Sequence, residues 1–235
     1  MTTPTFDVCI PFVGPKNWIV PCLKSINRSG GDYRIILFAN GANENLIREA
    51  YENIGGGPQI RLESSRTMPI IKPHNIMLAY ATAPYVVILN DDTEVSPDWL
   101  ENMRRCFDNP KVRLVAPLLD DANCHNRMAD HGPVRDGILY SAPFVDTQCV
   151  MLSRQTIKEF GYYSEEMNYR WDTEYALRVK ERGFDIAIDL RTVVKHKNGF
   201  TCSQVDPDVI PHCQADLRIL MARYPNYVPI WRAGL

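Results

Sequence analysis

Three polar residues that directly follow an apolar run are the first candidates for chemistry in this sequence. Asn90, Asp91 and Asp92 come immediately after residues 85–89 (YVVIL), the most apolar strand-like run of the chain. In open α/β sheets ligands bind beyond the carboxyl ends of the strands, and carboxylates there suit a hard divalent cation that carries phosphates. The alternative interpretation is a plain loop that caps the next helix.

Two further groups of candidates lie in the second half of the chain. Asp172 and Glu174 fall at the start of an amphipathic segment, residues 172–182. Acidic residues in a first helical turn often only complement the helix dipole, so a structural role stays open for both. His196 follows the strand-like run 192–195, and a histidine in that place is either a metal ligand or a structural residue.

Alternating strand-like and helix-like patterns must position these side chains. Continuous apolar runs such as 33–38 and 85–89 are typical of strands buried on both faces of a parallel sheet. The predicted strands are 6–12, 33–38, 59–62, 85–89, 112–116, 148–152, 185–189 and 192–195. The alternation predicts an α/β fold with a mostly parallel sheet.

The predicted helices follow from apolar residues at helical spacing and from capping residues. Five of them cover residues 16–28, 46–54, 73–82, 172–182 and about 213–223. Another begins after the capping residue Ser96, with Pro97 at its first position, and another begins after the capping residue Ser153 and ends at Gly161. Residues 118–146 are polar and rich in Gly and Pro, so they read as loop.

Length, charge and cysteine content narrow the class of protein. The chain has 235 residues, which fits a single domain, and a formal net charge of −2, which disfavours a nucleic-acid acceptor or partner. Its seven cysteines include no CxxC pair, as in a cytosolic protein with reduced thiols. No stretch has the length of a membrane span or the form of a signal peptide, so we expect a cytoplasmic protein.

Four motifs in order resemble family 2 glycosyltransferases, over roughly residues 5–200. They are Ile10-Pro11 at the end of the opening strand, HNIMLAYATAPYVVILNDDTEV, FGYYSEEMNYRWDTEYALRVKERGF, and the histidine of VVKHKNG. The resemblance implies a GT-A fold: a Rossmann-like, mostly parallel central sheet flanked by helices, with a smaller mixed sheet on the acceptor side. By this resemblance, the chain is expected to be one domain with a nucleotide-sugar-binding half (about 1–117), an acceptor half (about 118–200) and a helical tail (about 201–235).

The resemblance also implies roles for individual residues around the donor. Asp92 takes the last acidic position of the Asp-x-Asp motif, which binds the metal on the donor diphosphate, and His196 matches a further metal ligand. Asn90 takes the first position, which faces the ribose, and Asp91 is the variable middle residue. The family usually has Asp where this chain has Asn90, although Asn can still hydrogen-bond a ribose hydroxyl.

Other positions match the nucleotide site and the catalytic base. Pro11 and Phe12 lie near the nucleotide, and Asn40 follows the second strand, where the family often has an Asp that reads the base. Asp172 matches the catalytic base. Trp171 stands where the family has an acidic residue, which leaves Glu174 as a second candidate for the base.

The expected activity is that of an inverting, metal-dependent glycosyltransferase. It would use Mn²⁺ or Mg²⁺ and a nucleotide-diphosphate-sugar donor, with a carbohydrate, glycolipid, protein or modified base as acceptor. One alternative is a catalytically decayed nucleotide-sugar-binding or scaffold protein, which the departures at Asn90 and Trp171 favour. A sugar-phosphate nucleotidyltransferase is disfavoured because the stretch after the first strand, residues 13–16, has a single glycine.

Overall fold

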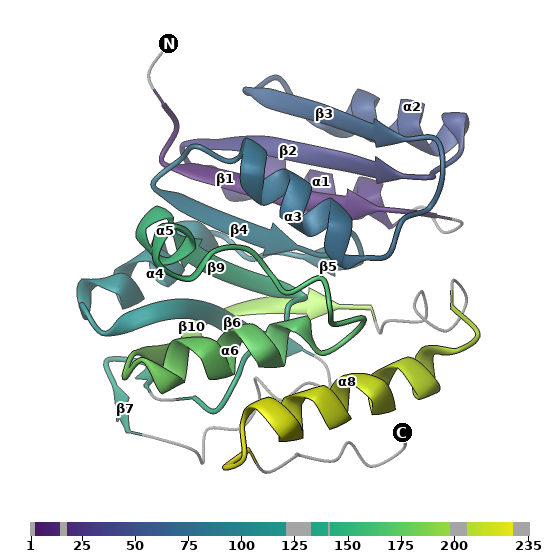
Figure 1. Ribbon diagram of the computed structural model, residues 1–235. Helices are drawn as coiled ribbons and strands as arrows, with labels where there is room; N and C mark the ends of the chain where they lie inside the picture. Colours follow the sequence, from purple (N-terminus) through teal and green to yellow (C-terminus); the bar gives the residue numbers. More distant parts are fainter. Residues whose placement is uncertain (1–2, 15–17, 121–132, 141, 198–205, 228–235) are drawn as a thin grey trace.

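One continuous sheet runs through the protein and carries helices on both faces (Figure 1). The computed structural model describes residues 3–14, 18–120, 133–140, 142–197 and 206–227. In these residues the strands are β1 (Phe6–Phe12), β2 (Tyr33–Asn40), β3 (Gln59–Ser64), β4 (Tyr85–Leu89), β5 (Thr93–Glu94), β6 (Val112–Asp120), β7 (Val134–Arg135), β8 (Ile138–Leu139), β9 (Cys149–Ser153) and β10 (Asp185–His196). The helices are α1 (Ile19–Ser29), α2 (Glu44–Asn53), α3 (Ile71–Tyr80), α4 (Trp99–Arg105), α5 (Arg154–Phe160), α6 (Trp171–Glu181) and α8 (Val209–Arg223), with a 3₁₀ turn at Cys106–Asp108.

The strand order is β3-β2-β1-β4-β9-β6-β10-β8-β7, and β5 pairs with β10. Strands β3, β2, β1 and β4 are parallel, which confirms the predicted α/β fold with a Rossmann-like half. β9 then runs antiparallel to both β4 and β6, and β10 runs parallel to β6. The mixed part of the fold therefore continues the same sheet, and it joins the parallel half through β9.

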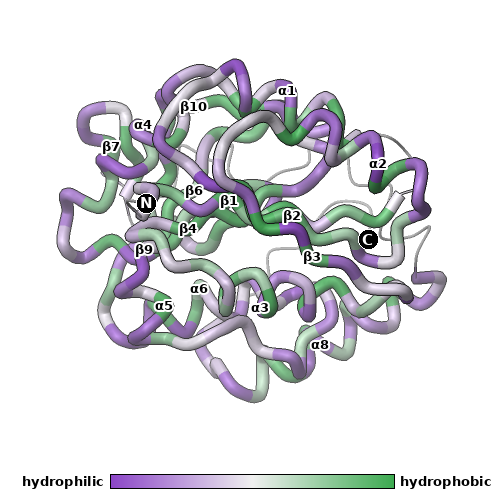
Figure 2. The backbone as a smooth tube through the Cα atoms, turned by 90° about the horizontal axis from the view of Figure 1, so that it is seen from above, coloured by the Kyte–Doolittle hydropathy of each residue, from purple (hydrophilic) through white to green (hydrophobic). Residues whose placement is uncertain are grey.

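Hydrophobic layers cover both faces of the sheet. Helices α1, α2 and α4 lie on one face, and α3, α5, α6 and α8 lie on the other (Figures 1 and 2). Strand β1 supplies both layers, because Val8 and Ile10 pack with α1 while Cys9 packs with the opposite cluster. This mostly apolar strand is therefore buried on both sides, as its sequence predicts, and its one charged residue, Asp7, is also buried.

The turn after β4 differs from the prediction. Ser96 and Pro97 do not open a helix; α4 begins at Trp99, after Asp98 in the left-handed region (φ 57°) and without a side-chain cap. The reason lies in the preceding residues. Thr93 and Glu94 form β5 against β10, and the Val95 N–H donates to Ser25 Oγ at 3.0 Å, so the chain stays extended before it turns.

The second half is more regular than its composition predicts. β6 continues to Asp120, and β7 and β8 form a hairpin inside the segment predicted as loop, while residues 121–132 lie outside the described residues. The hairpin turns at Asp136 and Gly137, which both have positive φ. Asp-Gly is a strong signal for such a turn, and the prediction of a loop over residues 118–146 is wrong at this hairpin.

Two other boundaries also shift. The strand-like runs 185–189 and 192–195 form one strand, β10, with an irregularity between Asp189 and Val193, where the buried Asp189 carboxylate accepts from Thr192 Oγ1 at 2.6 Å. α8 begins at Val209, four residues before the predicted start. The predicted cap of α5 is confirmed, because Ser153 Oγ accepts the Thr156 N–H at 3.0 Å.

Within the described part of the chain, no helix combines the length and the hydrophobicity needed to cross a membrane. Five cysteines there are free thiols, in agreement with the prediction: Cys9, Cys22, Cys106, Cys149 and Cys213.

Candidate active site

Asp92 and His196, separated by more than a hundred residues of sequence, meet at one edge of the sheet. The short strand β5 pairs Thr93 with His196, and the Lys197 N–H donates to the Asp92 carbonyl at 3.0 Å. The backbone thereby brings the imidazole Nε2 of His196 to 3.2 Å from Asp92 Oδ2. Both side chains are nearly inaccessible, at 4% exposure for Asp92 and 9% for His196.

The turn that carries these residues places two acidic side chains, Asp91 and Asp92, next to each other. Burial and the neighbouring Asp92 carboxylate raise the pKa of Asp91 to about 8. Asp92 Oδ1 is buried and accepts no hydrogen bond from the described residues. Two adjacent carboxyl groups with an oxygen left over, next to an imidazole, match the ligand types that bind divalent cations.

Asp92 and His196 are two candidate ligands, and the described residues bring no third His, Cys, Asp or Glu side chain into a cluster with them. A cation at this site would therefore keep coordination positions for oxygens from outside the described chain. Open positions are what a metal needs in order to bind a phosphate group directly.

Asn90 is fixed by its backbone. Its N–H donates to the Gln148 carbonyl at 2.9 Å, and its carbonyl accepts from Thr93 Oγ1 at 2.7 Å. The first bond extends the β4–β9 ladder by one pair beyond Leu89. The turn 90–93 is thus rigid, as a loop that must present carboxylates in one geometry should be.

Asn40 has a partner that the sequence did not indicate. At the end of β2, its buried side-chain amide donates to the Met68 carbonyl at 2.9 Å and accepts the Met68 N–H at 2.8 Å. Next to it, Gly41 has φ 70°, and a Cβ there would lie 2.5 Å from the Thr67 backbone nitrogen. Asn40 therefore holds the loop after β3 against the end of β2, and its base-reading role stays a prediction.

Pro11 and Phe12 form the end of β1 and are both buried, between the ends of β2 and β4. They lie at the same edge of the sheet as Asn40 and Asn90, because β1, β2 and β4 are parallel. The structure thus places the predicted nucleotide residues along one edge.

Asp172 lies in the first turn of α6 and is partly exposed. Its Oδ1 accepts the Thr173 N–H at 2.6 Å, and its Oδ2 accepts from Thr147 Oγ1 at 3.4 Å. Thr147 comes just before β9 and shares no motif with Asp172, so no pattern in the sequence pairs them.

Glu174, in the same turn, is in a different environment. It is 2% exposed, forms an ion pair with Arg178, and accepts from Tyr224 Oη at 3.0 Å and from Arg223 at 3.4 Å. Its carboxylate thus ties α6 to the end of α8. The two candidates for the base therefore differ in their surroundings: the Asp172 carboxylate is partly exposed to solvent, whereas the Glu174 carboxylate is buried among its partners.

Trp171 is a core residue in this structure. It is 5% exposed and packs at 4.7 Å, between ring centroids, against both His74 and Tyr163. Burial lowers the pKa of His74 to about 4, so this imidazole is neutral at physiological pH.

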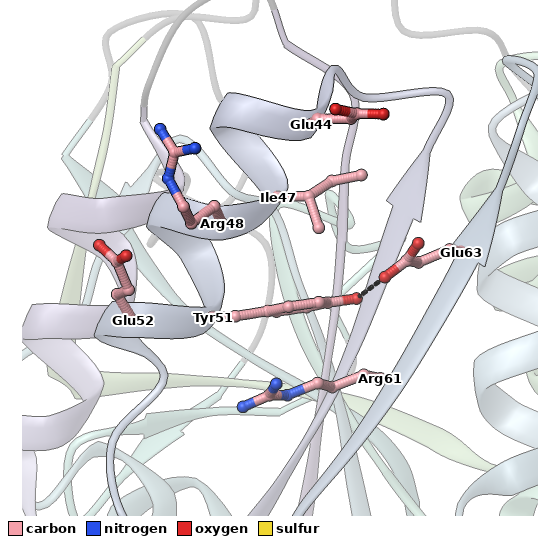
Figure 3. Close-up of a pocket in the computed structure, with 7 residues that line it drawn as sticks. All are labelled: Glu44, Ile47, Arg48, Tyr51, Glu52, Arg61 and Glu63. Carbon is pink, nitrogen blue, oxygen red and sulfur yellow. Dashed lines mark hydrogen bonds between the residues drawn. The ribbon is translucent and has the colours of Figure 1, made fainter.

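A separate hollow of about 470 Å³ lies between α2 and the edge strand β3 (Figure 3). It is lined by Glu44, Ile47, Arg48, Tyr51, Glu52, Arg61 and Glu63. Tyr51 Oη donates to Glu63 at 2.5 Å, and the Arg61 guanidinium lies 4.3 Å from the Tyr51 ring centroid. Charged side chains of both signs line it, and none of the predicted site residues does.

Comparison with known proteins identifies the family. Residues 7–159 match the family described as "Glycosyl transferase family 2", which is more than half of the chain. The chain belongs to glycosyl transferase family 2. The match includes Asn90–Asp92 and ends before Asp172 and His196, and no protein of curated function matches the chain.

Solved structures extend the likeness to the rest of the fold. The mannosyltransferase PcManGT from Pyrobaculum calidifontis, in complex with GDP-Man and Mn²⁺, superposes with a TM-score of 0.71 at 14% identity, over 97% of this chain and 66% of that one. GalNAc-T7 with UDP, GalNAc and Mn²⁺ gives 0.73 at 13% identity, over 93% and 48%. S. aureus TarS 1-349 gives 0.63 at 12% identity, over 82% and 60%.

These neighbours have the GT-A fold, which confirms the predicted fold class. The chain spans 48% to 66% of the lengths of these three proteins. At such low identities the likeness shows the fold, and the chemistry must be argued from this chain's own residues.

Proposed function

We propose that this protein is an inverting, metal-dependent glycosyltransferase that transfers a sugar from a nucleotide-diphosphate donor to an acceptor hydroxyl. The observation that carries the proposal is the buried Asp92–His196 pair, 3.2 Å apart at the carboxyl edge of the sheet. Family membership and the Mn²⁺ and nucleotide ligands of two structural neighbours support it.

Asp92 and His196 would hold Mn²⁺ or Mg²⁺. The Asp92 oxygen without a hydrogen-bond donor is the ligand atom that such an ion needs. The bound ion would neutralise charge on the diphosphate leaving group. Asp91, beside it, would be favoured in its ionised form once a cation is bound, because a nearby opposite charge lowers the pKa of a carboxyl group.

Asp172 is the proposed general base. An acceptor hydroxyl would transfer its proton to the Asp172 carboxylate while its oxygen forms a bond to the anomeric carbon, and the bond from that carbon to the diphosphate oxygen breaks. Attack opposite the leaving group inverts the anomeric centre and needs no covalent intermediate. Glu174 is unsuited to this task because Arg178 and Tyr224 already occupy its carboxylate.

The nucleotide would lie along the edge formed by Pro11, Phe12, Asn40 and Asn90. Asn90 would hydrogen-bond the ribose. Asn40 would act on the base indirectly, through the loop that it fixes at Met68. The acceptor (carbohydrate, glycolipid, protein or modified base) and the cytoplasmic location remain predictions from the sequence.

Thermal unfolding in the presence of nucleotides tests the donor site first. UDP, GDP, UDP-GalNAc and GDP-mannose would each be added with and without Mn²⁺. A ligand at 100 times its dissociation constant raises stability by about 2.7 kcal/mol. We expect one nucleotide to stabilise the protein only with Mn²⁺, and we expect Asp92→Ala to remove that effect.

Release of nucleoside diphosphate from the selected donor then separates an enzyme from a decayed binding protein. Mn²⁺-dependent turnover that Asp172→Asn abolishes supports the enzyme. Metal-dependent binding without turnover under any acceptor condition would favour the scaffold alternative, and the absence of binding to every nucleotide would refute the donor site.

A further inference from the structure

Helix α8 carries a buried carboxylate that points at the start of α6. Asp216 lies on α8 and is 0% exposed. Its Oδ2 accepts the backbone N–H groups of Asn168 at 2.9 Å, Tyr169 at 2.6 Å and Arg170 at 3.0 Å. Its Oδ1 accepts the side-chain amide of Asn168 at 3.1 Å.

These three residues directly precede α6, which has no cap of its own. Arg170 occupies the N-cap position and makes no capping hydrogen bond with its side chain. Backbone N–H groups at a helix start need acceptors, and a carboxylate there also interacts favourably with the helix dipole. Asp216, 46 residues after Arg170 on another helix, accepts the N–H of this N-cap residue and of the two residues before it.

Further contacts fix two of these residues, Tyr169 and Arg170, to α8 and to the turn before it. Tyr169 Oη donates to Asp206 Oδ2 at 2.8 Å, which His212 Nδ1 also contacts at 2.7 Å. The Arg170 guanidinium donates to the Cys213 carbonyl at 3.3 Å. The two helices lie on the same face of the sheet (Figure 1), and Glu174 joins them again at Tyr224.

We propose that Asp216 is a positioning residue for Asp172. It holds residues 168–170 in one conformation, and those residues determine where the first turn of α6, and with it the Asp172 carboxylate, stands relative to the donor. The inference rests on the proposed role of Asp172 as the base. It makes α8, which lies beyond the family match, part of the catalytic apparatus.

The test compares Asp216→Ala and Asp216→Asn with the wild-type chain, and Asp208→Asn is the matched control. Asp208 is an exposed aspartate next to the start of the same helix. Asn at position 216 retains one acceptor oxygen and so keeps a folded variant in the set if Ala does not fold. The probes are Mn²⁺ with GDP-mannose or UDP-GalNAc, whichever donor the wild-type chain turns over.

We expect Asp216→Ala to lower kcat by about 10²-fold, as small displacements of a catalytic group do, and Asp216→Asn to lower it less. The KM for the donor and the Mn²⁺-dependent stabilisation by nucleoside diphosphate should not change, whereas a general loss of structure would alter both. Amide hydrogen exchange, which needs no donor, should accelerate at residues 168–172 and stay as in the wild type in β1–β4. The control should behave as wild type.

A folded Asp216→Ala variant with wild-type kcat, beside an inactive Asp172→Asn variant, overturns the positioning role and leaves the proposed base intact. Unchanged exchange at residues 168–170 in Asp216→Ala also overturns it. An Asp172→Asn variant with wild-type kcat rejects the proposed base instead, and the positioning role falls with it.

Discussion

His196 Nε2 lies 3.2 Å from Asp92 Oδ2, and both side chains are enclosed at the carboxyl edge of the sheet. The contact depends on β5, whose two residues pair with the end of β10. The extended residues 93–94, which replace the helix cap predicted at Ser96, therefore hold the end of β10 beside Asp92.

Replacement of His196 by Gln should weaken the metal site without removing the donor site. We expect the Mn²⁺ concentration for half-maximal activity to rise by about 10–100-fold, the range seen when even a supporting group of a metal site is lost. Titration of activity or of nucleotide-induced stabilisation with Mn²⁺ measures this. Asp208→Asn is the control, because that aspartate is exposed and lies away from the Asp92–His196 pair at the start of α8. Equal Mn²⁺ requirements in both variants would exclude His196 as a ligand.

Asp172→Asn and Glu174→Gln should fail in different ways, although the residues lie two positions apart. We expect Asp172→Asn to lower kcat by about 10²–10⁴-fold with donor binding retained, as for loss of a general base. Glu174→Gln should instead destabilise the fold by about 1–3 kcal/mol, since it weakens hydrogen bonds to charged partners at a buried site. Denaturant unfolding and steady-state kinetics on both variants separate the two effects. The opposite pattern would transfer the role of base to Glu174.

The sequence predicted the parallel half of the sheet well, since β1, β2 and β4 are each dominated by apolar residues. Asn90–Asp92 and His196 were candidates because they follow strand-like runs, and the resemblance to family 2 glycosyltransferases gave them roles that stay predictions. It could not predict the order of β9, β6 and β10, which depends on long-range pairing. The β7–β8 hairpin was missed because a polar composition outweighed its Asp-Gly turn.

The contacts that distinguish Asp172 from Glu174 were also beyond the sequence. Both are acidic residues in one helical turn, and their environments come from Thr147, Arg223 and Tyr224, which are distant in the chain. Asp216 could not be recognised in the sequence for the same reason, because the N–H groups that it accepts belong to residues 168–170, at least 46 positions away in the chain.

Replacement of Asn40 tests whether this side chain supports the loop at Met68 or contacts the nucleotide base directly. Asn40→Ala leaves the Met68 N–H and carbonyl without their buried partner, and each such loss costs about 1–3 kcal/mol. We therefore expect a lower melting temperature and weaker binding of the selected nucleotide. If Asn40 acts through the loop, the ratio of affinities for UDP and GDP should stay constant while both fall. A change in that ratio, measured by calorimetry, would show that the side chain reads the base directly.

His74 should make the stability of the protein fall in mild acid. Its Nδ1–H donates to the Ile70 carbonyl at 2.6 Å, while its buried Nε2 has no hydrogen-bond partner in the described residues, so a second proton is unfavourable in the folded state. Burial lowers its pKa from 6.5 to about 4. Above pH 6.5 the imidazole of His74 is neutral in both the folded and the unfolded chain, so the full stability of the fold is present. As the pH falls from 6.5 towards 4, the unfolded chain binds the proton first, and this stability is lost.

The free energy of unfolding that is lost through His74 amounts to about 3 kcal/mol, since each unit of pKa shift corresponds to about 1.36 kcal/mol. Urea unfolding of the wild type and of His74→Gln at pH 7 and at pH 4.5 isolates it, since all other titrating groups are common to both. The wild type should lose more stability than the variant between the two pH values. Equal losses would mean that the imidazole takes up its proton in the folded state, and that the packing of Trp171 against it tolerates a charge.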